Sequence, residues 1–371
     1  MSIRRIAIST GGGDAPGLNA VIRAVVVASL NRGWEVVGIR DGYNGLLEPE
    51  RYKTPLVKLD RESVRGITHL GGTILGTTNR GNPMRYPKLG PEGSLVEVDR
   101  CAEVVEAFKK QEIDALISIG GDGSMEIAAH LFDLGVRVIG VPKTIDNDLD
   151  GTFVTFGFDS AVSFATECID RLHSTAEAHQ RVLVVEVMGR YAGWIALHAG
   201  LAGTADVILL PEIPYQTEAV AAKIRERNAH GRNFTIVVVA EGAHPSGATT
   251  SVIGREVGRA ERLGGAGNRL TKELEQLCGQ EARCVVLGHL LRGGGPNATD
   301  RLISLRFGAA AVRALEQGES GVLVALDPPH VRYIPLSECT HRCKTVPVDC
   351  DTVQTCRDLG VYFGDEVLAA T

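Results

Sequence analysis

Short runs rich in valine, isoleucine and leucine recur along the chain and repeatedly end in glycine, proline or aspartate. Continuous apolar runs of this kind, bounded by turn residues, are typical of parallel strands that are buried on both faces. The pattern predicts strands at residues 5–9, 36–40, 115–119, 137–141, 182–187, 207–210, 234–240, 284–287 and 322–326.

Between these runs lie segments in which apolar residues recur at helical spacing. They predict helices at residues 18–31, 101–110, 124–134, 161–173, 218–228 and 267–277. Alternation of strand and helix indicates an α/β fold with open, mostly parallel sheets. In such sheets ligands bind outside the carboxyl ends of the strands, which is where we expect the functional residues.

Length and charge narrow the function classes. A chain of 371 residues, 44% hydrophobic and 23% charged, is long enough for two domains, and we expect a boundary near Gly157. The net charge of -6 gives no general attraction to nucleic acid or to an anionic membrane, so an anionic ligand needs a local basic cluster. No export signal or long apolar run is seen, and we expect a cytoplasmic protein.

Eight cysteines in a chain of this length are too sparse for a disulfide scaffold and indicate reduced thiols. Four of them, Cys339, Cys343, Cys350 and Cys356, fall in a polar C-terminal stretch. Five residues separate the second pair, whereas zinc ribbons usually have about two to four. We therefore expect incidental surface or packing cysteines, with structural zinc as the alternative.

The first chemical motif is GGGDAPGLN at residues 11–19, which directly follows a predicted strand and opens a helix. Small residues there leave backbone amides free to face an anion, and the helix N-terminus adds partial positive charge. The run matches neither the Walker pattern nor the dinucleotide fingerprint. It predicts a phosphate cradle, and the alternative is a tight turn without a ligand.

The second motif, GGDGS at residues 120–124, repeats this geometry with a carboxylate inserted. An acid beside a phosphate cradle would repel the ligand unless a metal lies between them, so Asp122 indicates a Mg²⁺ site. Similar turns occur in lipid kinases and NAD kinases. A bare turn with a solvated acid is the structural alternative.

The third motif is PKTIDND at residues 142–148, at the end of another predicted strand. Asp146 and Asp148 can face the same way in an extended segment, so that one accepts a proton while the other supports metal or substrate. This arrangement suits transfer to a hydroxyl group. An acidic turn bonded to its own backbone is the alternative.

Basic groups lie at the ends of later strands, at residues 179–181, 188–190, 283 and 289–294. Arginine suits bidentate phosphate binding because its charge is permanent. Single arginines are usually solvated. Their grouping at strand ends nevertheless favours a phosphorylated substrate, and His289 is either a ligand contact or a hydrogen-bonded core residue.

The ordered set GGGDAPGLN, GGDGS, PKTIDND, HQR, VEVMGRYAG, AEG and LGHLLRGG resembles the 6-phosphofructokinase family. The resemblance implies two Rossmann-like three-layer α/β/α domains with the active site in the cleft between them. It implies Mg²⁺-dependent transfer from ATP to the 1-hydroxyl of fructose 6-phosphate, in glycolysis, by a homodimer or homotetramer with shared active sites. A lipid or NAD-type kinase and a noncatalytic sugar-phosphate sensor are the remaining alternatives.

The same resemblance divides the chain. It implies a phosphoryl-donor domain, for ATP and Mg²⁺, of residues 1–157 with about 291–341. The fructose 6-phosphate domain would comprise about 158–290 with 342–371.

Residue roles also follow from the resemblance. Asp146 corresponds to the general base toward the sugar hydroxyl, Thr144 lies beside it, and Arg190 corresponds to the group that stabilises the transferring phosphoryl. Sugar-phosphate contacts are implied for Thr144, Asp146, Asp148, Arg181, Met188, Gly189, Arg190, Glu241, Arg283, His289 and Arg292. Of these, Arg181 and Arg283 resemble residues that reach the 6-phosphate from an adjacent subunit. Donor contacts are implied for Gly12, Tyr43, Arg80, Asp122, Gly123, Ser124 and Lys143, with Asp122 also the metal-site acid.

Two positions disagree about the phosphoryl donor. Glycine at the position of Gly123 goes with ATP in the family, because a side chain there, typically aspartate, would crowd the nucleotide. Lysine at the position of Lys143 resembles the pyrophosphate-dependent branch. A clash excludes a ligand, whereas an extra cation is tolerated beside either polyphosphate. We therefore expect ATP, with pyrophosphate as the alternative.

Overall fold

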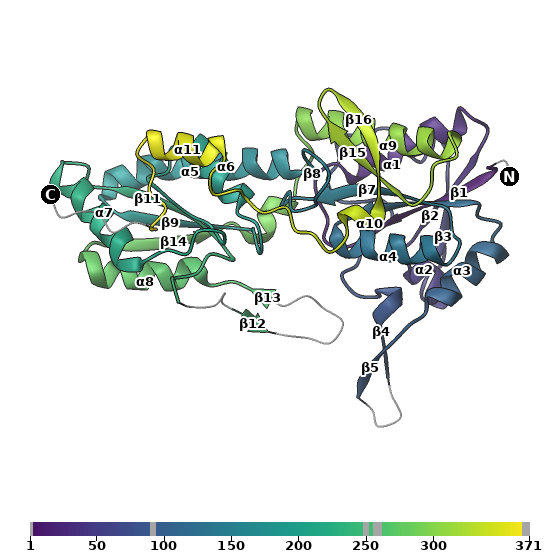
Figure 1. Cartoon of the computed structure of the whole chain (residues 1–371), viewed down its shortest axis with the longest axis horizontal. Coiled ribbons are helices and arrows are strands. Elements are labelled where there is room, and N and C mark those ends of the chain that lie inside the picture. The colour runs from purple at the N-terminus through teal and green to yellow at the C-terminus, as the bar shows by residue number, and fades with distance from the viewer. Residues whose placement is uncertain (1–2, 90–93, 248–251, 255–261, 366–371) are drawn as a thin grey trace.

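The computed structural model describes residues 3–89, 94–247, 252–254 and 262–365. Two separate β-sheets lie along the long axis of the molecule, each covered by helices (Figure 1). The larger sheet combines the N-terminal strands with two strands from late in the chain, and the smaller sheet is built from the segment between them.

The larger sheet has the strand order β16-β15-β7-β6-β1-β2-β3, with β8 paired to β7. Its central strands are parallel, and only the edge pairs β2–β3 and β15–β16 are antiparallel. The strands are β1 (Arg5–Thr10), β2 (Glu35–Ile39), β3 (Leu56–Leu59), β6 (Ala115–Gly120), β7 (Val138–Thr144), β8 (Phe156–Gly157), β15 (Val322–Asp327) and β16 (His330–Pro335).

Helices cover both faces of this sheet. Because successive strand residues point to opposite faces, Ile6 and Ile8 pack with α1 and α9, while Ala7 packs with the helices of the other face. One face carries α1 (Leu18–Leu30) and α9 (Ala298–Glu316). The other carries α2 (Asn44–Leu47), α3 (Cys101–Lys110), α4 (Asp122–Asp133) and α10 (Leu336–Cys339).

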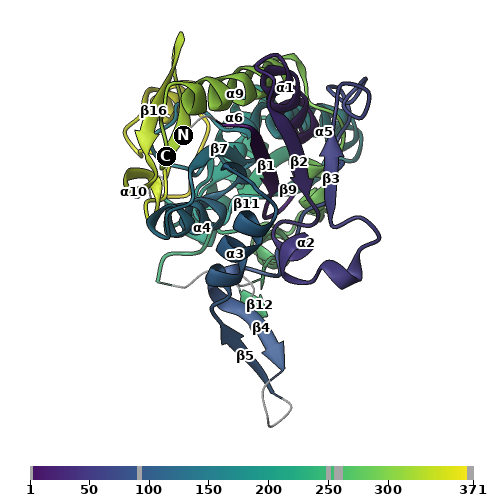
Figure 2. The same ribbon diagram turned by 90° about the vertical axis from the view of Figure 1, so that its right-hand side faces the viewer.

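A two-stranded hairpin projects away from this half of the molecule (Figure 2). It consists of β4 (Tyr86–Leu89) and β5 (Leu95–Val98), which pair antiparallel. The hairpin and the short helices η1 (Pro49–Arg51) and η2 (Pro83–Arg85) were not among the predicted elements.

The smaller sheet has the order β10-β11-β9-β14, and all its pairs are parallel. Helices α5 and α6 pack on one face, with α11 beside α6, and α7 and α8 cover the other (Figure 1). The elements are α5 (Phe158–His179), β9 (Val182–Val187), α6 (Trp194–Ala202), β10 (Val207–Leu209), α7 (Thr217–Ala229), β11 (Thr235–Ala240), α8 (Ala266–Cys278), β14 (Ala282–Val286) and α11 (Asp351–Asp358). The strands β12 (Val252–Gly254) and β13 (Arg262–Leu263) form a separate antiparallel pair.

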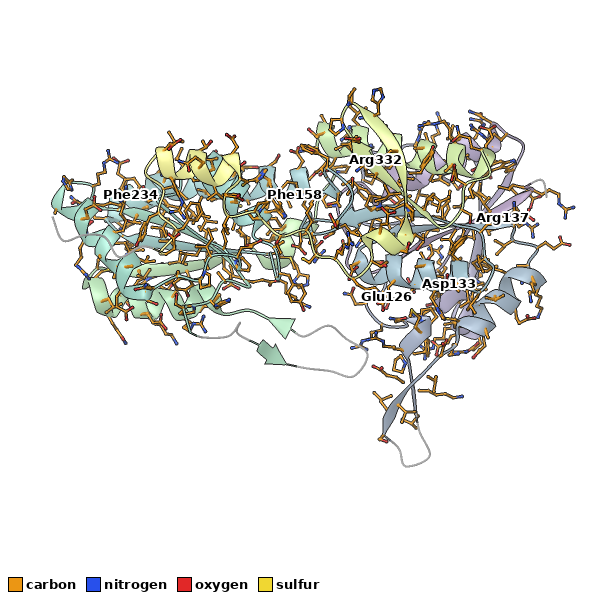
Figure 3. The ribbon with its side chains drawn as sticks, viewed as in Figure 1. Glu126, Asp133, Arg137, Phe158, Phe234 and Arg332 are labelled. Carbon is orange, nitrogen blue, oxygen red and sulfur yellow. The ribbon has the colours of Figure 1, made fainter. Side chains whose placement is uncertain are left out.

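The chain passes between the two halves three times. It leaves the larger sheet after β8, returns through η3 (Gly288–Arg292), and crosses again after α10. The first residue of α5, Phe158, lies at this junction (Figure 3), where its ring and the His198 ring pack edge to face with their centroids 5.3 Å apart. The predicted α/β class with mostly parallel sheets is confirmed.

All nine predicted strands and all six predicted helices form. The long helix α9 and the helix α6 were missed. Helix α6 is apolar nearly all round because it lies between other elements, so it shows no amphipathic stripe. Among the described residues, no helix combines the length and the apolar character needed to cross a membrane.

The close contact between α1 and α9 depends on Gly308. A Cβ at this position would lie 2.7 Å from both the Cβ of Ala24 and the carbonyl oxygen of Val21. We predict that Gly308→Ala lowers the free energy of unfolding by about 1–3 kcal/mol, because overpacking outweighs the better helix propensity of alanine. Urea denaturation measures this change.

Gly123→Ala is the matched control for this stability test. Gly123 also lies in a helix, and its added Cβ would meet nothing within 4 Å. Its free energy of unfolding should stay level or rise by up to about 1 kcal/mol. Equal stability of the two variants would contradict the account of the α1–α9 contact.

Candidate active site

The loop after β1 is fixed by the neighbouring strand and by the loop around Thr77. The amide of Gly11 donates to the carbonyl oxygen of Ile119 at 2.9 Å, and the Thr77 hydroxyl donates to the carbonyl of Gly12 at 2.6 Å. Gly17, directly before α1, has a φ of 112°, which favours glycine. The result is a rigid turn that leads into the N-terminus of α1, as a phosphate cradle requires.

The loop after β6 packs against the first one through Ser124. A Cβ on Gly11 or on Gly120 would come 2.6 Å or 2.1 Å from the Ser124 hydroxyl oxygen, so both positions need glycine. Gly123, in contrast, faces open space. Parallel pairing of β1 with β6 therefore places the two glycine motifs side by side at one edge of the sheet.

The carboxyl end of β7 contributes Lys143, which is only 3% exposed. Its ammonium donates to the carbonyl oxygen of Gly13 at 2.5 Å, so it links the third motif to the first. Burial, and then the positive charge of Arg292, lower the pKa of Lys143 to about 8. This cation lies against the predicted phosphate cradle.

Asp146 lies in the loop that directly follows β7. Its Oδ1 is fully enclosed and has no hydrogen-bond partner, while its backbone amide donates to the hydroxyl oxygen of Thr144 at 3.1 Å. Burial, followed by the charge of Asp148, raises the pKa of Asp146 to about 6, and Arg292, Lys143 and Arg190 oppose this rise. A half-buried carboxylate with one enclosed, unpartnered oxygen among cations is suited to accept a proton.

The smaller sheet supplies the opposite side of this cluster from the carboxyl ends of β9, β11 and β14. Arg190, with Met188 and Gly189, follows β9, and Glu241 follows β11. Burial, and then the charge of Asp146, raise the pKa of Glu241 to about 7. These charges thus act on one another although they belong to different sheets.

Arg292 reaches across the junction from the end of η3. Its guanidinium donates to the carbonyl oxygen of Asp14 at 3.2 Å, and a Cβ on Gly13 would lie 2.9 Å from its Nη1. His289 is exposed in the same short helix. Arg292 therefore brings a positive charge from the connection between the two halves to the first glycine loop.

Arg181 and Arg283 are not brought to this cluster. Both pair with Glu281, and they lie at the amino ends of β9 and β14, at the opposite edge of the smaller sheet. A six-residue strand spans about 20 Å, so the two arginines are well separated from Arg190 in the same chain.

Two of the predicted donor residues, Tyr43 and Arg80, lie in different environments. The Tyr43 side chain is 5% exposed and packs in the core of the larger half, where burial raises its pKa. The donor contact at Tyr43 stays a prediction, and the burial of the ring means that little of its side chain is exposed to meet a ligand. Arg80 is exposed near the first loop, and its amide donates to the hydroxyl of Thr78, whose carbonyl accepts from Gly12.

Asp122, the first residue of α4, is the predicted metal-site acid. Its side chain is exposed, and partial desolvation and the negative charges of Asp148 and Glu126 raise its pKa. Carboxylates that repel one another in this way match the oxygen ligands that Mg²⁺ prefers. Figure 3 shows Glu126 on α4, on the larger half of the molecule.

One other group of possible metal ligands occurs within the described residues. Asp99, Cys101 and His130 have ligand atoms within 4.8 Å of one another. However, Asp99 already accepts from the Cys101 amide at 2.8 Å, and burial raises the pKa of the Cys101 thiol to about 12. We interpret the hydrogen bond from the Cys101 amide to Asp99 as part of the start of α3 and not as part of a metal site.

The C-terminal cysteines do not gather into one site. Cys339 lies in the core of the larger half and Cys356 in the core of the smaller half. Cys343 is exposed, and all four thiols of the C-terminal stretch are free.

Sequence reasoning missed Thr77 and Lys344, which hold the site loops. The Lys344 ammonium donates to the side-chain oxygen of Asn147 at 2.9 Å, between the two acids of the third motif. Its sequence neighbourhood is polar and carries no recognisable motif, so no local signal identified it.

Comparisons with known proteins agree with this geometry. A family model described as Phosphofructokinase matches residues 5–315. The chain is 52% identical to an ATP-dependent 6-phosphofructokinase of Chloroflexus aggregans, over 98% of this chain and 99% of the relative. It is 49% identical to a pyrophosphate–fructose 6-phosphate 1-phosphotransferase of Amycolatopsis mediterranei, over 97% and 100%.

The fold also matches a solved structure. The phosphofructokinase of Pichia pastoris in its T-state superposes with a TM-score of 0.76 at 30% identity, and the match covers 91% of this chain and 35% of that longer chain. The residues matched by the family model include the motifs that form the charged cluster. The relatives and the solved structure point to the same family. The chain therefore belongs to the phosphofructokinase family.

Proposed function

We propose that the protein is an ATP-dependent 6-phosphofructokinase, which forms fructose 1,6-bisphosphate from fructose 6-phosphate in glycolysis. The observation that carries the proposal is the enclosed, unpartnered Oδ1 of Asp146 and the positive charges of Lys143, Arg190 and Arg292 that act on this carboxylate. A noncatalytic sensor has no need of such a base. A lipid or NAD-type kinase has no need of the arginines that suit a sugar 6-phosphate.

The chemistry follows from these positions. Asp146 takes the proton of the sugar 1-hydroxyl as that oxygen attacks the terminal phosphorus of ATP, the bond from this phosphorus to the bridging oxygen breaks, and ADP leaves. Thr144 holds the Asp146 backbone. Arg190 neutralises charge on the transferring phosphoryl oxygens, which carry most of the charge in a loose transition state. Met188, Gly189, Glu241, His289 and Arg292 would orient the sugar phosphate.

The donor side of the site lies on the larger half. We assign donor binding to residues 1–157 with about 291–341, and sugar-phosphate binding to about 158–290 with 342–371. The first turn of α4, with Ser124, would face the phosphates beside the loop at Gly12, whose own amide donates to the carbonyl oxygen of Thr78. Asp122 would hold Mg²⁺, which neutralises phosphate charge when bound.

A second copy of the chain would complete the sugar-phosphate site. Arg181 and Arg283 lie at the far edge of the smaller sheet, so a single chain does not bring them to Asp146. We propose a homodimer or homotetramer in which these arginines reach the 6-phosphate of a neighbour, in the cytoplasm.

Overall similarity does not identify the phosphoryl donor, because relatives named for ATP and for pyrophosphate are 52% and 49% identical to the chain. The donor is therefore inferred from single residues of the site. The open space at Gly123 favours ATP. With Mg²⁺ and fructose 6-phosphate, we predict fructose 1,6-bisphosphate formation with ATP and a rate at least about 100-fold lower with pyrophosphate. A coupled assay run with both donors measures this ratio, and faster turnover with pyrophosphate would reverse the assignment.

The matched variant is Gly123→Asp. Its carboxylate would occupy the open space and repel the donor phosphates, so kcat/KM for ATP should fall about 100-fold or more. Gly123→Ala should lose much less, because a methyl group carries no charge. An unchanged kcat/KM for ATP in Gly123→Asp would show that the donor does not pass this position.

The lowered pKa of Lys143 predicts that donor binding weakens at alkaline pH. Its charged form attracts the polyphosphate, and its pKa is lowered to about 8, so kcat/KM for the donor should fall as pH rises above about 8. Bound phosphates favour the charged lysine, so the limit in kcat should lie at higher pH. In Lys143→Arg the charge is permanent and the limit should disappear up to about pH 10. The same limit in both proteins would assign it to another group.

A further inference from the structure

Residues 340–346, which we call the strap, connect α10 of the larger half to the segment before α11 of the smaller half. The strap lies along the third motif. The backbone of His341 hydrogen-bonds to Asp122, Cys343 forms an isolated β-bridge with Leu149, and the amide of Lys344 donates to the carbonyl oxygen of Asp148 at 2.8 Å. It thus contacts the catalytic loop and lies where His341 affects the pKa of the metal-site acid.

The Lys344 side chain fixes this loop from within. Its ammonium donates to Oδ1 of Asn147 at 2.9 Å and to the carbonyl oxygens of Thr152 and Phe153 at 2.9 Å and 3.1 Å. An ammonium has three N–H donors, so these three oxygens satisfy it completely. Lys344 is half-buried, and this burial lowers its pKa to about 8.

The partner of this ammonium lies between the two acids. Asn147 has a φ of 53°, a left-handed conformation, and its Oδ1 also accepts from the amide of Thr155 at 3.1 Å. Asp146 and Asp148 flank it, so the directions of their carboxylates depend on how Asn147 is held. The hydrogen bonds that Lys344 and Thr155 donate fix the Asn147 side chain.

The other side of the strap is bound to the smaller half. The Trp194 indole N–H donates to the carbonyl oxygen of Lys344 at 2.8 Å, and the Val346 amide donates to Glu212 at 2.8 Å. Glu212 also accepts from the amide of Gly193 at 3.0 Å. Gly193 and Trp194 directly follow the loop that carries Arg190.

We propose that Lys344 is a positioning residue for phosphoryl transfer, which sets Asp146 against Arg190 by bonding the catalytic loop and the smaller half to one strap. The inference rests on the proposed function. Displacing a reacting group by about 1 Å can cost about 100-fold in rate, so a loosened Asn147 affects turnover more than substrate binding.

The test is Lys344→Met, which keeps the apolar stem beside Trp194 and removes the three donors. We expect kcat to fall about 10-fold or more, with KM for fructose 6-phosphate within about threefold of the wild type. Lys109→Met, at an exposed lysine of α3, is the matched control and should leave both constants unchanged. A Lys344→Met protein with wild-type kcat would overturn the proposal.

A double-mutant cycle separates positioning from general destabilisation. Asn147→Gly permits the same positive φ and removes the partner of the ammonium. If Lys344 acts through Asn147, the kcat of the double variant should match that of the worse single variant, and multiplying losses would contradict this route.

Trp194→Phe keeps the aromatic ring but removes the donor to the strap, and it decides the matter if Lys344→Met fails to fold. Its kcat should fall about threefold or more with an unchanged melting temperature, and an unchanged kcat would overturn the proposal. Wild-type protein without fructose 6-phosphate kinase activity would instead refute the proposed function.

Discussion

The site depends on compensation of one buried negative charge. A carboxylate oxygen enclosed without a hydrogen-bond partner, as Oδ1 of Asp146 is, is costly unless cations are near, and the charges of Lys143, Arg190 and Arg292 act on Asp146. These cations come from both halves of the molecule, and two of them also bond to the first glycine loop. The same charge therefore determines how the catalytic loop, the phosphate cradle and the smaller sheet are arranged around one another.

Much of this arrangement follows from the sequence because buried parallel strands leave a strong apolar signal and because their carboxyl ends share one edge. The amino-acid sequence alone is therefore enough to place the three motif loops together. The separation of Arg181 from Arg190 could also be predicted from the sequence, because Arg181 precedes β9 and Arg190 follows it. The burial of Tyr43 could not be predicted from the sequence, because it depends on helices from other parts of the chain that pack around it.

The strap shows why the remainder could not be predicted. Lys344 bonds to carbonyl oxygens 191 and 192 positions earlier, and only the folded chain brings them together. A backbone carbonyl carries no residue-specific signal in the sequence. Family membership does not supply the missing detail either, since relatives named for different donors are similarly close to this chain. Donor choice and loop positioning are properties of single side chains on a shared fold.

The central claim is that Asp146 is the base that accepts the proton of the sugar hydroxyl. Steady-state kinetics of Asp146→Asn with ATP, Mg²⁺ and fructose 6-phosphate tests it most directly, with Asp133→Asn at the exposed end of α4 as the control (Figure 3). The account predicts that kcat falls by about 10²- to 10⁴-fold while KM for the sugar phosphate changes little. Turnover close to that of the wild type would contradict it.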